Sequence, residues 1–171
     1  DWSGAAYIGA LSYLGGEVDV MGLDKGSLQG DAICTRCFEA LSSGMTTINI
    51  ADTPDLAPIL FALSAAKHGG VFTGTKRLKI KESDRIKSTI DTLKAFNISA
   101  WSDGHKLEVF GGKTASGKAV SCNDHRIAMA AAVLATGTAG QSEIIDAQAV
   151  NKSYPTFYQD LISVGGKVSE I

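Results

Sequence analysis

The sequence predicts an α/β fold (α+β in some schemes) built from repeated β-α-β-α-β-β units, with buried helices inside and sheets outside. One pattern occurs three times along the 171 residues: an Asp, a run of small apolar residues, Gly, and a β-rich stretch. The apolar runs are rich in Ala and nearly free of charge, which indicates helices that are buried on all sides. With 44% hydrophobic residues, the chain suits a single domain over residues 1–171.

The three copies of the pattern begin at Asp1, Asp55 and Asp124. Asp is a good helix N-cap because its carboxylate accepts a hydrogen bond from a free backbone N–H, and Gly commonly ends a helix. Each copy is therefore predicted to form a buried helix and then a strand. The predicted helices end at Gly residues 15–16, 69–70 and 137, and the strands that follow are 17–20, 71–73 and 144–145.

A second helix, amphipathic in pattern, is predicted in each copy, and further strands lie between the copies. These helices are predicted at 31–41, 84–96 and 154–164, and the further strands at 47–50, 107–110 and 119–121. The third copy ends after its second helix, so we expect a strand from elsewhere to complete it. The chain also opens without Met, which predicts that it is cut from a longer protein.

Composition and cysteine usage narrow the classes of function. The net charge of −2 gives no reason to expect a nucleic acid or an anionic membrane as partner, and no apolar run is long enough to cross a bilayer. Cys34 and Cys37 form a C-x-x-C that could signal redox or zinc chemistry. They lie inside a helical pattern without a second pair of ligands, which favours two small residues on a helix face. We expect no metal and a reducing, cytoplasmic compartment.

Charged residues gather near predicted helix starts, where free N–H groups attract anions. Lys81 and Arg85 are four residues apart and of like sign, which is unfavourable on a helix unless an anion lies between them. Arg126 lies near the start of an apolar helix, where the helix dipole disfavours a cation. A solvated charged face is the alternative interpretation. The pattern favours a site for phosphate or carboxylate, bound by Arg as a fork and by Lys as a point charge.

Six segments, in order along the chain, resemble motifs of the 5-enolpyruvylshikimate-3-phosphate synthases. They are DWS at 1–3, QGD at 29–31, TPD at 53–55, KIKESDR at 79–85, NDHRIAM at 123–129 and KSYPTF at 152–157. The resemblance covers essentially the whole chain and implies the alpha-beta prism of the enolpyruvyl transferases. It further implies that the chain is the carboxy-terminal half of such an enzyme, without its amino-terminal domain.

The resemblance implies a reaction of the shikimate pathway of aromatic amino acid biosynthesis. Phosphoenolpyruvate and shikimate 3-phosphate give enolpyruvylshikimate 3-phosphate and phosphate, with no cofactor and no metal. Asp55 is the implied base for the attacking 5-hydroxyl, and Glu82 the implied acid toward the methylene carbon of phosphoenolpyruvate. Arg77 stands where some members have Asn. The implied substrate-binding residues are Lys81, Arg85, Arg126, Lys152 and His125.

By the same resemblance, the missing amino-terminal domain supplies the opposite wall of the site, so we expect this chain to be inactive alone. We expect the protein to be a monomer. Two alternatives stay open at this point. A UDP-N-acetylglucosamine enolpyruvyl transferase shares the fold and phosphoenolpyruvate, and a non-catalytic ligand-binding module could keep the fold. The acceptor that the full-length protein consumes would separate the first alternative from the synthase.

Overall fold

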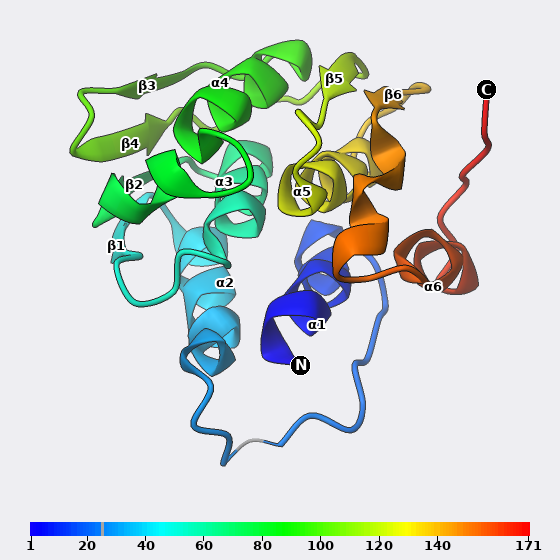
Figure 1. Ribbon diagram of the computed structural model, residues 1–171, viewed down its shortest axis with the longest axis horizontal. Helices are drawn as coiled ribbons and strands as arrows, with labels where there is room; N and C mark the ends of the chain where they lie inside the picture. The colour runs from blue at the N-terminus through cyan, green and yellow to red at the C-terminus, as the bar shows by residue number, and fades with distance from the viewer. Residues whose placement is uncertain (25) are drawn as a thin grey trace.

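The computed structural model describes residues 1–24 and 26–171, which form both helices and strands (Figure 1). The α-helices are α1 (Trp2–Gly9), α2 (Cys34–Ser43), α3 (Ala57–Ala66), α4 (Arg85–Ala95), α5 (His125–Thr136) and α6 (Phe157–Ser163). The strands are β1 (Thr46–Asn49), β2 (Gly70–Thr73), β3 (Ala100–Ser102), β4 (Lys106–Val109), β5 (Lys118–Val120) and β6 (Glu143–Ile145). Four 3-10 helices join them: η1 (Ala10–Leu14), η2 (Gly30–Ile33), η3 (Thr75–Ile80) and η4 (Ala147–Lys152).

One complete β-α-β-α-β-β unit occupies residues 46–109, in the order β1-α3-β2-α4-β3-β4. Its four strands form one sheet in the order β1-β2-β4-β3. β1 and β2 are parallel because α3 carries the chain back between them, and the other two pairs are antiparallel. The middle of the chain therefore has the predicted repeat in full.

The other two units are partial within the described residues. The third consists of β5-α5-β6-α6, with β5 and β6 as a parallel pair. The first has α1 and α2, but the strand predicted at 17–20 is wrong, because these residues form no strand. Val18 and Val20 are half-buried against the core while Glu17 and Asp19 face solvent. The alternation is real, but no described strand lies beside this segment to pair with it.

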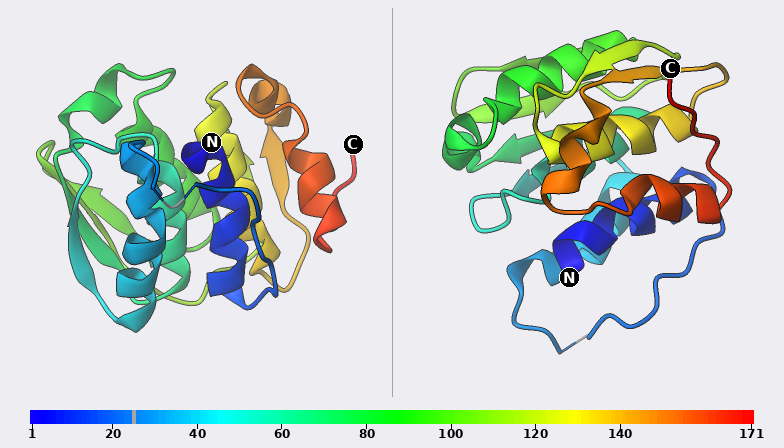
Figure 2. Two further views of the ribbon diagram at one scale, coloured as in Figure 1. Left: turned by 90° about the horizontal axis from the view of Figure 1, so that it is seen from below. Right: turned by 45° about the vertical axis from the view of Figure 1, so that its right-hand side comes forward.

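The predicted buried helices form the centre of the molecule, where α1, α3 and α5 lie side by side (Figure 2). In α3, nine of the ten residues are buried, so this helix has no solvent face. α5 is similar, and both Ala131 and Leu134 are fully buried as predicted. Phe61 of α3 packs edge-on against Phe72 of β2, with ring centroids 4.7 Å apart, and so fixes this core against the sheet.

Two of the three predicted Asp caps are confirmed. Asp1 caps α1 by accepting a bond from the Gly4 N–H, and Asp124 caps α5 by accepting from the Arg126 N–H. The prediction for Asp55 is wrong, since α3 begins at Ala57 and the Asp55 carboxylate makes no cap bond. Pro58 in the first turn has no N–H to donate, and the Asp55 side chain is bound by cations instead.

Candidate functional site

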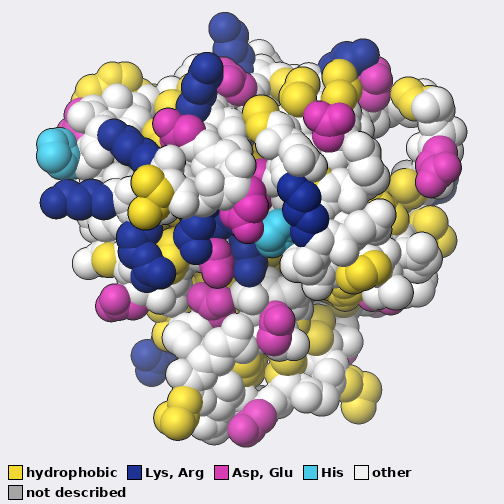
Figure 3. Space-filling model, in the orientation of Figure 1, with side chains coloured by type: hydrophobic (Ala, Val, Ile, Leu, Met, Phe, Trp, Pro, Cys, Tyr) yellow, Lys and Arg dark blue, Asp and Glu magenta, His cyan; other side chains and the backbone are white. Residues whose placement is uncertain are grey.

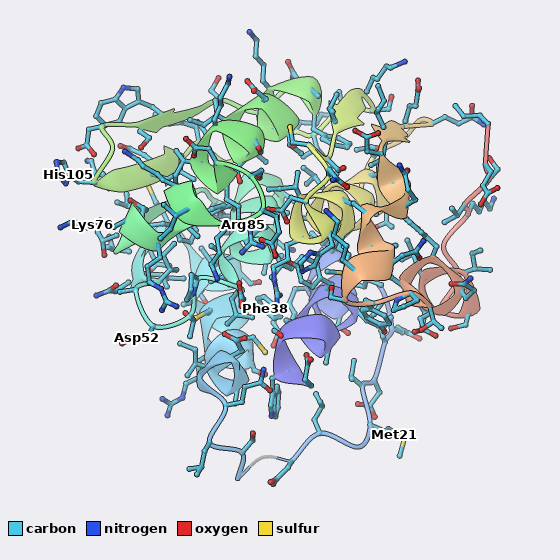
Figure 4. The ribbon with its side chains drawn as sticks, in the orientation of Figure 1. Met21, Phe38, Asp52, Lys76, Arg85 and His105 are labelled. Carbon is cyan, nitrogen blue, oxygen red and sulfur yellow. The ribbon has the colours of Figure 1, made fainter. Side chains whose placement is uncertain are left out.

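The candidate site lies where the starts of α1, α4 and α5 meet the loop before α3. Charged side chains of both signs gather near the middle of this face of the molecule (Figure 3). Arg85 lies inside, between the starts of α4 and α5, whereas Lys76 and His105 lie at the outer edge (Figure 4). Arg85 is therefore the central cation of the site.

Arg85, the first residue of α4, is fully buried and contacts three carboxylates. Its Nε donates to Asp124 Oδ2 at 2.8 Å, its Nη1 to Asp55 Oδ1 at 2.9 Å, and its Nη2 to Glu82 Oε2 at 2.7 Å. The planar guanidinium suits such a fork of bonds. Burying one charge is costly unless it is paired and hydrogen-bonded, and here each edge of the guanidinium has an acidic partner.

Asp55 is the acceptor that the cations of the site share. Besides Arg85, the Nζ of Lys81 lies 3.2 Å and the Nε of Arg126 lies 3.4 Å from Asp55 Oδ1. Partial burial raises the pKa of this carboxyl, but the charge of Arg126 and the hydrogen bonds from Arg85 and Lys81 outweigh it and hold the pKa below its usual range. Asp55 is therefore an ionised carboxylate at neutral pH.

Arg126, the second residue of α5, joins three parts of the chain. Its Nη1 donates to the backbone carbonyl of Asp55 at 3.1 Å, and its Nη2 lies 3.5 Å from Ser3 Oγ on α1. Its side chain is mostly buried, with 11% exposed. Arg126 is thus more accessible than Arg85 and less firmly bound.

Glu82 and His125 face one another beside Arg85. The Nδ1 of His125 lies 3.8 Å from Glu82 Oε1, and it has no hydrogen-bond partner within the described part of the chain. Burial and then the charge of Arg126 lower the pKa of this imidazole, while Glu82 opposes the change. His125 is therefore neutral at pH 7 and can act as a hydrogen-bonding group beside a carboxylate.

Lys152 stands at the end of η4, next to the start of α5. Its Nζ donates to the backbone carbonyl of Asn123 and its side chain is exposed. Cys122 and Asn123 both have positive φ angles, 53° and 56°, in this turn. The structure therefore places Lys152 beside the cluster, bound to the backbone of the turn and not to the carboxylates.

The sequence reasoning missed three side chains that the structure brings to this cluster. The Ser83 hydroxyl donates to Asp124 Oδ2 at 3.1 Å. Ser3 and Tyr7 are buried on α1 near Arg126, and their spacing of four residues in an apolar helix is the signal that could have found them. Ser83 and Ser3 contact charged residues that the sequence analysis singled out, namely Asp124 and Arg126.

Gly74 allows the two loops of the site to approach each other. It precedes η3 with a φ of 74°, and a Cβ at this position would lie 2.7 Å from the backbone nitrogen of Ala51. A left-handed conformation and so close an approach both favour glycine. The loop that carries Asp55 and the segment that carries Lys81 and Glu82 are thereby packed together.

Within residues 1–24 and 26–171, no group of three or more His, Cys, Asp or Glu side chains is arranged to hold a metal ion. Cys34 and Cys37 lie on helix α2, as predicted, and both are buried, which raises the pKa of each thiol. No helix in this part of the chain is long and apolar enough to cross a bilayer.

Comparison with known proteins places this chain in a family. The model of the family described as EPSP synthase (3-phosphoshikimate 1-carboxyvinyltransferase) matches residues 1–161. A 3-phosphoshikimate 1-carboxyvinyltransferase of Clostridium kluyveri is 35% identical over 99% of this chain and 44% of its own length. One of Pyrococcus abyssi is 36% identical over 94% of this chain and 43% of its own length. The chain thus spans less than half the length of these curated relatives.

A solved structure shows the same fold. The EPSP synthase of Acinetobacter baumannii superposes with a TM-score of 0.78 over 98% of this chain and 47% of that one, at 21% sequence identity. This likeness shows that the two proteins share a fold. Since the family model covers nearly the whole sequence, the chain belongs to the EPSP synthase family.

Proposed function

We propose that this chain forms one half of an enzyme that transfers the enolpyruvyl group of phosphoenolpyruvate to the 5-hydroxyl of shikimate 3-phosphate. The names of the curated relatives support this activity. The observation that carries the proposal is the arrangement of the two candidate proton-transfer groups. Asp55 and Glu82 are both bonded to the one guanidinium of Arg85, which fixes two carboxylates beside a set of cations.

The cations suit the charge of the substrates. Phosphoenolpyruvate carries a phosphate and a carboxylate, and shikimate 3-phosphate carries one of each. Lys81, Arg126 and Lys152 are each at least partly exposed, and we assign them to these anions. Arg85 is fully enclosed, so it could contact an anion only by exchanging one of its carboxylate partners. His125 lies beside this set.

The proposed chemistry has two steps. In the first, Asp55 takes the proton of the 5-hydroxyl and the oxygen bonds to the central carbon of phosphoenolpyruvate. Glu82, which takes up a proton from solvent as the substrates bind, gives this proton to the methylene carbon. In the second, Glu82 takes a proton back from the new methyl group, the bond to phosphate breaks, and phosphate leaves with the proton held by Asp55. Each positioned acid or base contributes about 100- to 10,000-fold.

Ligand binding would change the strength of Asp55 as a base. In this state three cations lower its pKa, which makes it a weak base. An anion that binds Lys81 and Arg126 would draw their charge away from the carboxylate and raise its proton affinity. The base would then gain strength only when substrate is in place.

We further propose that the other half of the relatives' length supplies a second domain over this face. Four anionic groups must be held together, and the described cations form one side only. Around an open half-site, water screens the charges, so that an ion pair at 4 Å gives about 1 kcal/mol in bulk water against roughly 4 near a protein surface. We therefore expect the 171-residue chain alone to release no phosphate from the two substrates.

The experiment compares two neighbouring Asp residues in the full-length protein. Asp55→Asn should lower turnover of phosphoenolpyruvate and shikimate 3-phosphate by about 100-fold or more. Asp52 is exposed in the same loop, so Asp52→Asn serves as the matched control and should leave turnover unchanged. Equal turnover in both variants, or no turnover by the unaltered protein, would contradict the proposal.

A further inference from the structure

Helix α1 presents two hydroxyl groups to the start of α5. Ser3 and Tyr7 are four residues apart, so they share one face of α1. Ser3 is 7% exposed and Tyr7 is fully buried. The Tyr7 hydroxyl has no hydrogen-bond partner within residues 1–24 and 26–171, which is uncommon for a buried polar group and needs a physical reason.

The surroundings of Tyr7 point to Arg126. Burial raises the pKa of the phenol above its ordinary range. The charges of Arg126 and Arg85 oppose that rise, as does a contact between the phenol oxygen and Arg126 that falls outside ordinary hydrogen-bond geometry. The phenol is therefore neutral at physiological pH, and its oxygen is a neutral acceptor beside a guanidinium. Because Tyr7 lies inside the core, this oxygen cannot turn to solvent for a partner.

Arg126 is held loosely in this state. Its contacts with Asp55 Oδ1 at 3.4 Å and with Ser3 Oγ at 3.5 Å lie at the long end of hydrogen-bond distances. A guanidinium has five N–H donors, and the contacts of Arg126 with the described residues do not use all of them. A small rotation away from Asp55 would bring it closer to the hydroxyls of α1.

Ser3 is already oriented to accept such a bond. Its hydroxyl donates to the carboxylate of Asp1 at 3.1 Å, so the lone pairs of Ser3 Oγ are free to face Arg126. Asp1 is itself fixed because it caps α1. The helix cap therefore holds Ser3 Oγ in an orientation in which it can accept a bond from Arg126 without turning.

We propose that Tyr7, together with Ser3, is a positioning residue that holds Arg126 when an anion occupies the site. On binding phosphate or carboxylate, the guanidinium leaves the Asp55 carboxylate and takes the two hydroxyls of α1 as its partners. Neutral acceptors position the cation without cancelling its charge, which stays available to the anion. The identification of this anion as phosphoenolpyruvate rests on the proposed function.

The test uses inorganic phosphate as the probe and Tyr158 as the control. The Tyr158 hydroxyl is likewise buried and without a described partner, but it belongs to α6. Phosphate is titrated into the 171-residue chain and followed by the NMR signal of the Arg126 Nε–H. Tyr7→Phe should weaken phosphate binding by about tenfold, the effect of one hydrogen bond to a charged group, whereas Tyr158→Phe should leave it unchanged.

Stability separates positioning from packing. Removing an unpaired buried hydroxyl should leave Tm equal or slightly higher in both variants. Unchanged phosphate affinity in Tyr7→Phe, with or without a fall in Tm, overturns the proposal, and so does an equal loss of affinity in both variants. If Tyr7→Phe does not fold, Ser3→Ala takes its place, with the same weakened binding expected and unchanged binding overturning the proposal. Phosphate binding involves no turnover, so these results do not depend on which substrates the full-length protein converts.

Discussion

Asp124 accepts a hydrogen bond from the Nε of Arg85 at 2.8 Å, and neither side chain is exposed to solvent. The two residues are 39 positions apart. Asp124 also caps α5, and Arg85 is the first residue of α4. This one ion pair therefore ties together the starts of two helices, and the other charged groups of the site are arranged around it.

Breaking this pair should destabilise the fold strongly. Asn is a good N-cap, so Asp124→Asn keeps the cap of α5 but leaves Arg85 buried with one fewer negative partner. We expect the free energy of unfolding to fall by about 3 kcal/mol, as for other broken buried pairs, measured by urea unfolding. Glu143→Gln, which removes an exposed pair with Lys118, is the control and should cost about 1 kcal/mol or less. Equal losses would contradict the assignment.

Stability should decrease in acid because of the carboxylates of the site. Asp124 is buried, which raises its pKa, but bonds from Arg85 more than reverse this and lower it; the pKa of Asp55 is also lowered. An unfolded Asp has a pKa of about 3.9, so the unfolded chain takes up protons first as the pH falls. The stabilisation is therefore present above about pH 4 and is lost below it. Urea midpoints between pH 7 and pH 3 should show this fall, and Asp124→Asn should make it shallower. An unchanged slope in the variant would contradict the assignment.

His125 should titrate below the ordinary range for histidine. Its pKa is lowered by burial and by the charge of Arg126, so NMR of the imidazole nitrogens should give a midpoint below about 6.5, the value for an unfolded His. The unfolded chain then binds a proton first, and this contribution to stability is lost as the pH falls through 6.5. Since Glu82 opposes the shift, Glu82→Gln should lower the midpoint further. A midpoint that rises in this variant would show that the two side chains do not face each other.

A Cβ at Gly74 should disturb the site through its loops. Gly74→Ala adds the strain of a positive φ, of order 1–3 kcal/mol, and a contact at 2.7 Å with the backbone of Ala51. Gly15 has a φ of 99° with no atom within 4 Å of a Cβ, so Gly15→Ala gives the strain without the contact. We expect Gly74→Ala to lose more stability in urea than Gly15→Ala, and the reverse order would contradict this account.

The sequence predicted the central unit well because its signals are local. The apolar pattern of α3 and the strands on either side of it depend on residues close together in the chain, and so do the caps at Asp1 and Asp124 outside this unit. The strand at 17–20 was predicted on its alternation, which was real. Strand formation also needs a neighbour, and that depends on distant parts of the chain.

The surroundings of the charged residues likewise depend on distant parts of the chain. Asp55 has the right residue type for an N-cap, but Lys81, Arg85 and Arg126 bind its carboxylate, and only the folded chain brings them there. Arg85 belongs to a run of charges that resembles a solvent-exposed face. Its complete burial depends on acidic partners 30 and 39 positions away, a separation that no local pattern reveals.

The strand pairs of the first sheet join residues that are close along the chain, whereas the bonds of Arg126 join distant ones. This difference should set the order of folding. All strand pairs of the first sheet lie within residues 46–109, whereas Arg126 bonds to residues 71 and 123 positions away. Contacts between nearby residues close shorter loops and form sooner. We expect pulse-labelled amides of β2 and β4 to gain protection before those of α1. Arg126 would then be secured last and loosen first, so that mild denaturant abolishes anion binding while the sheet is still intact.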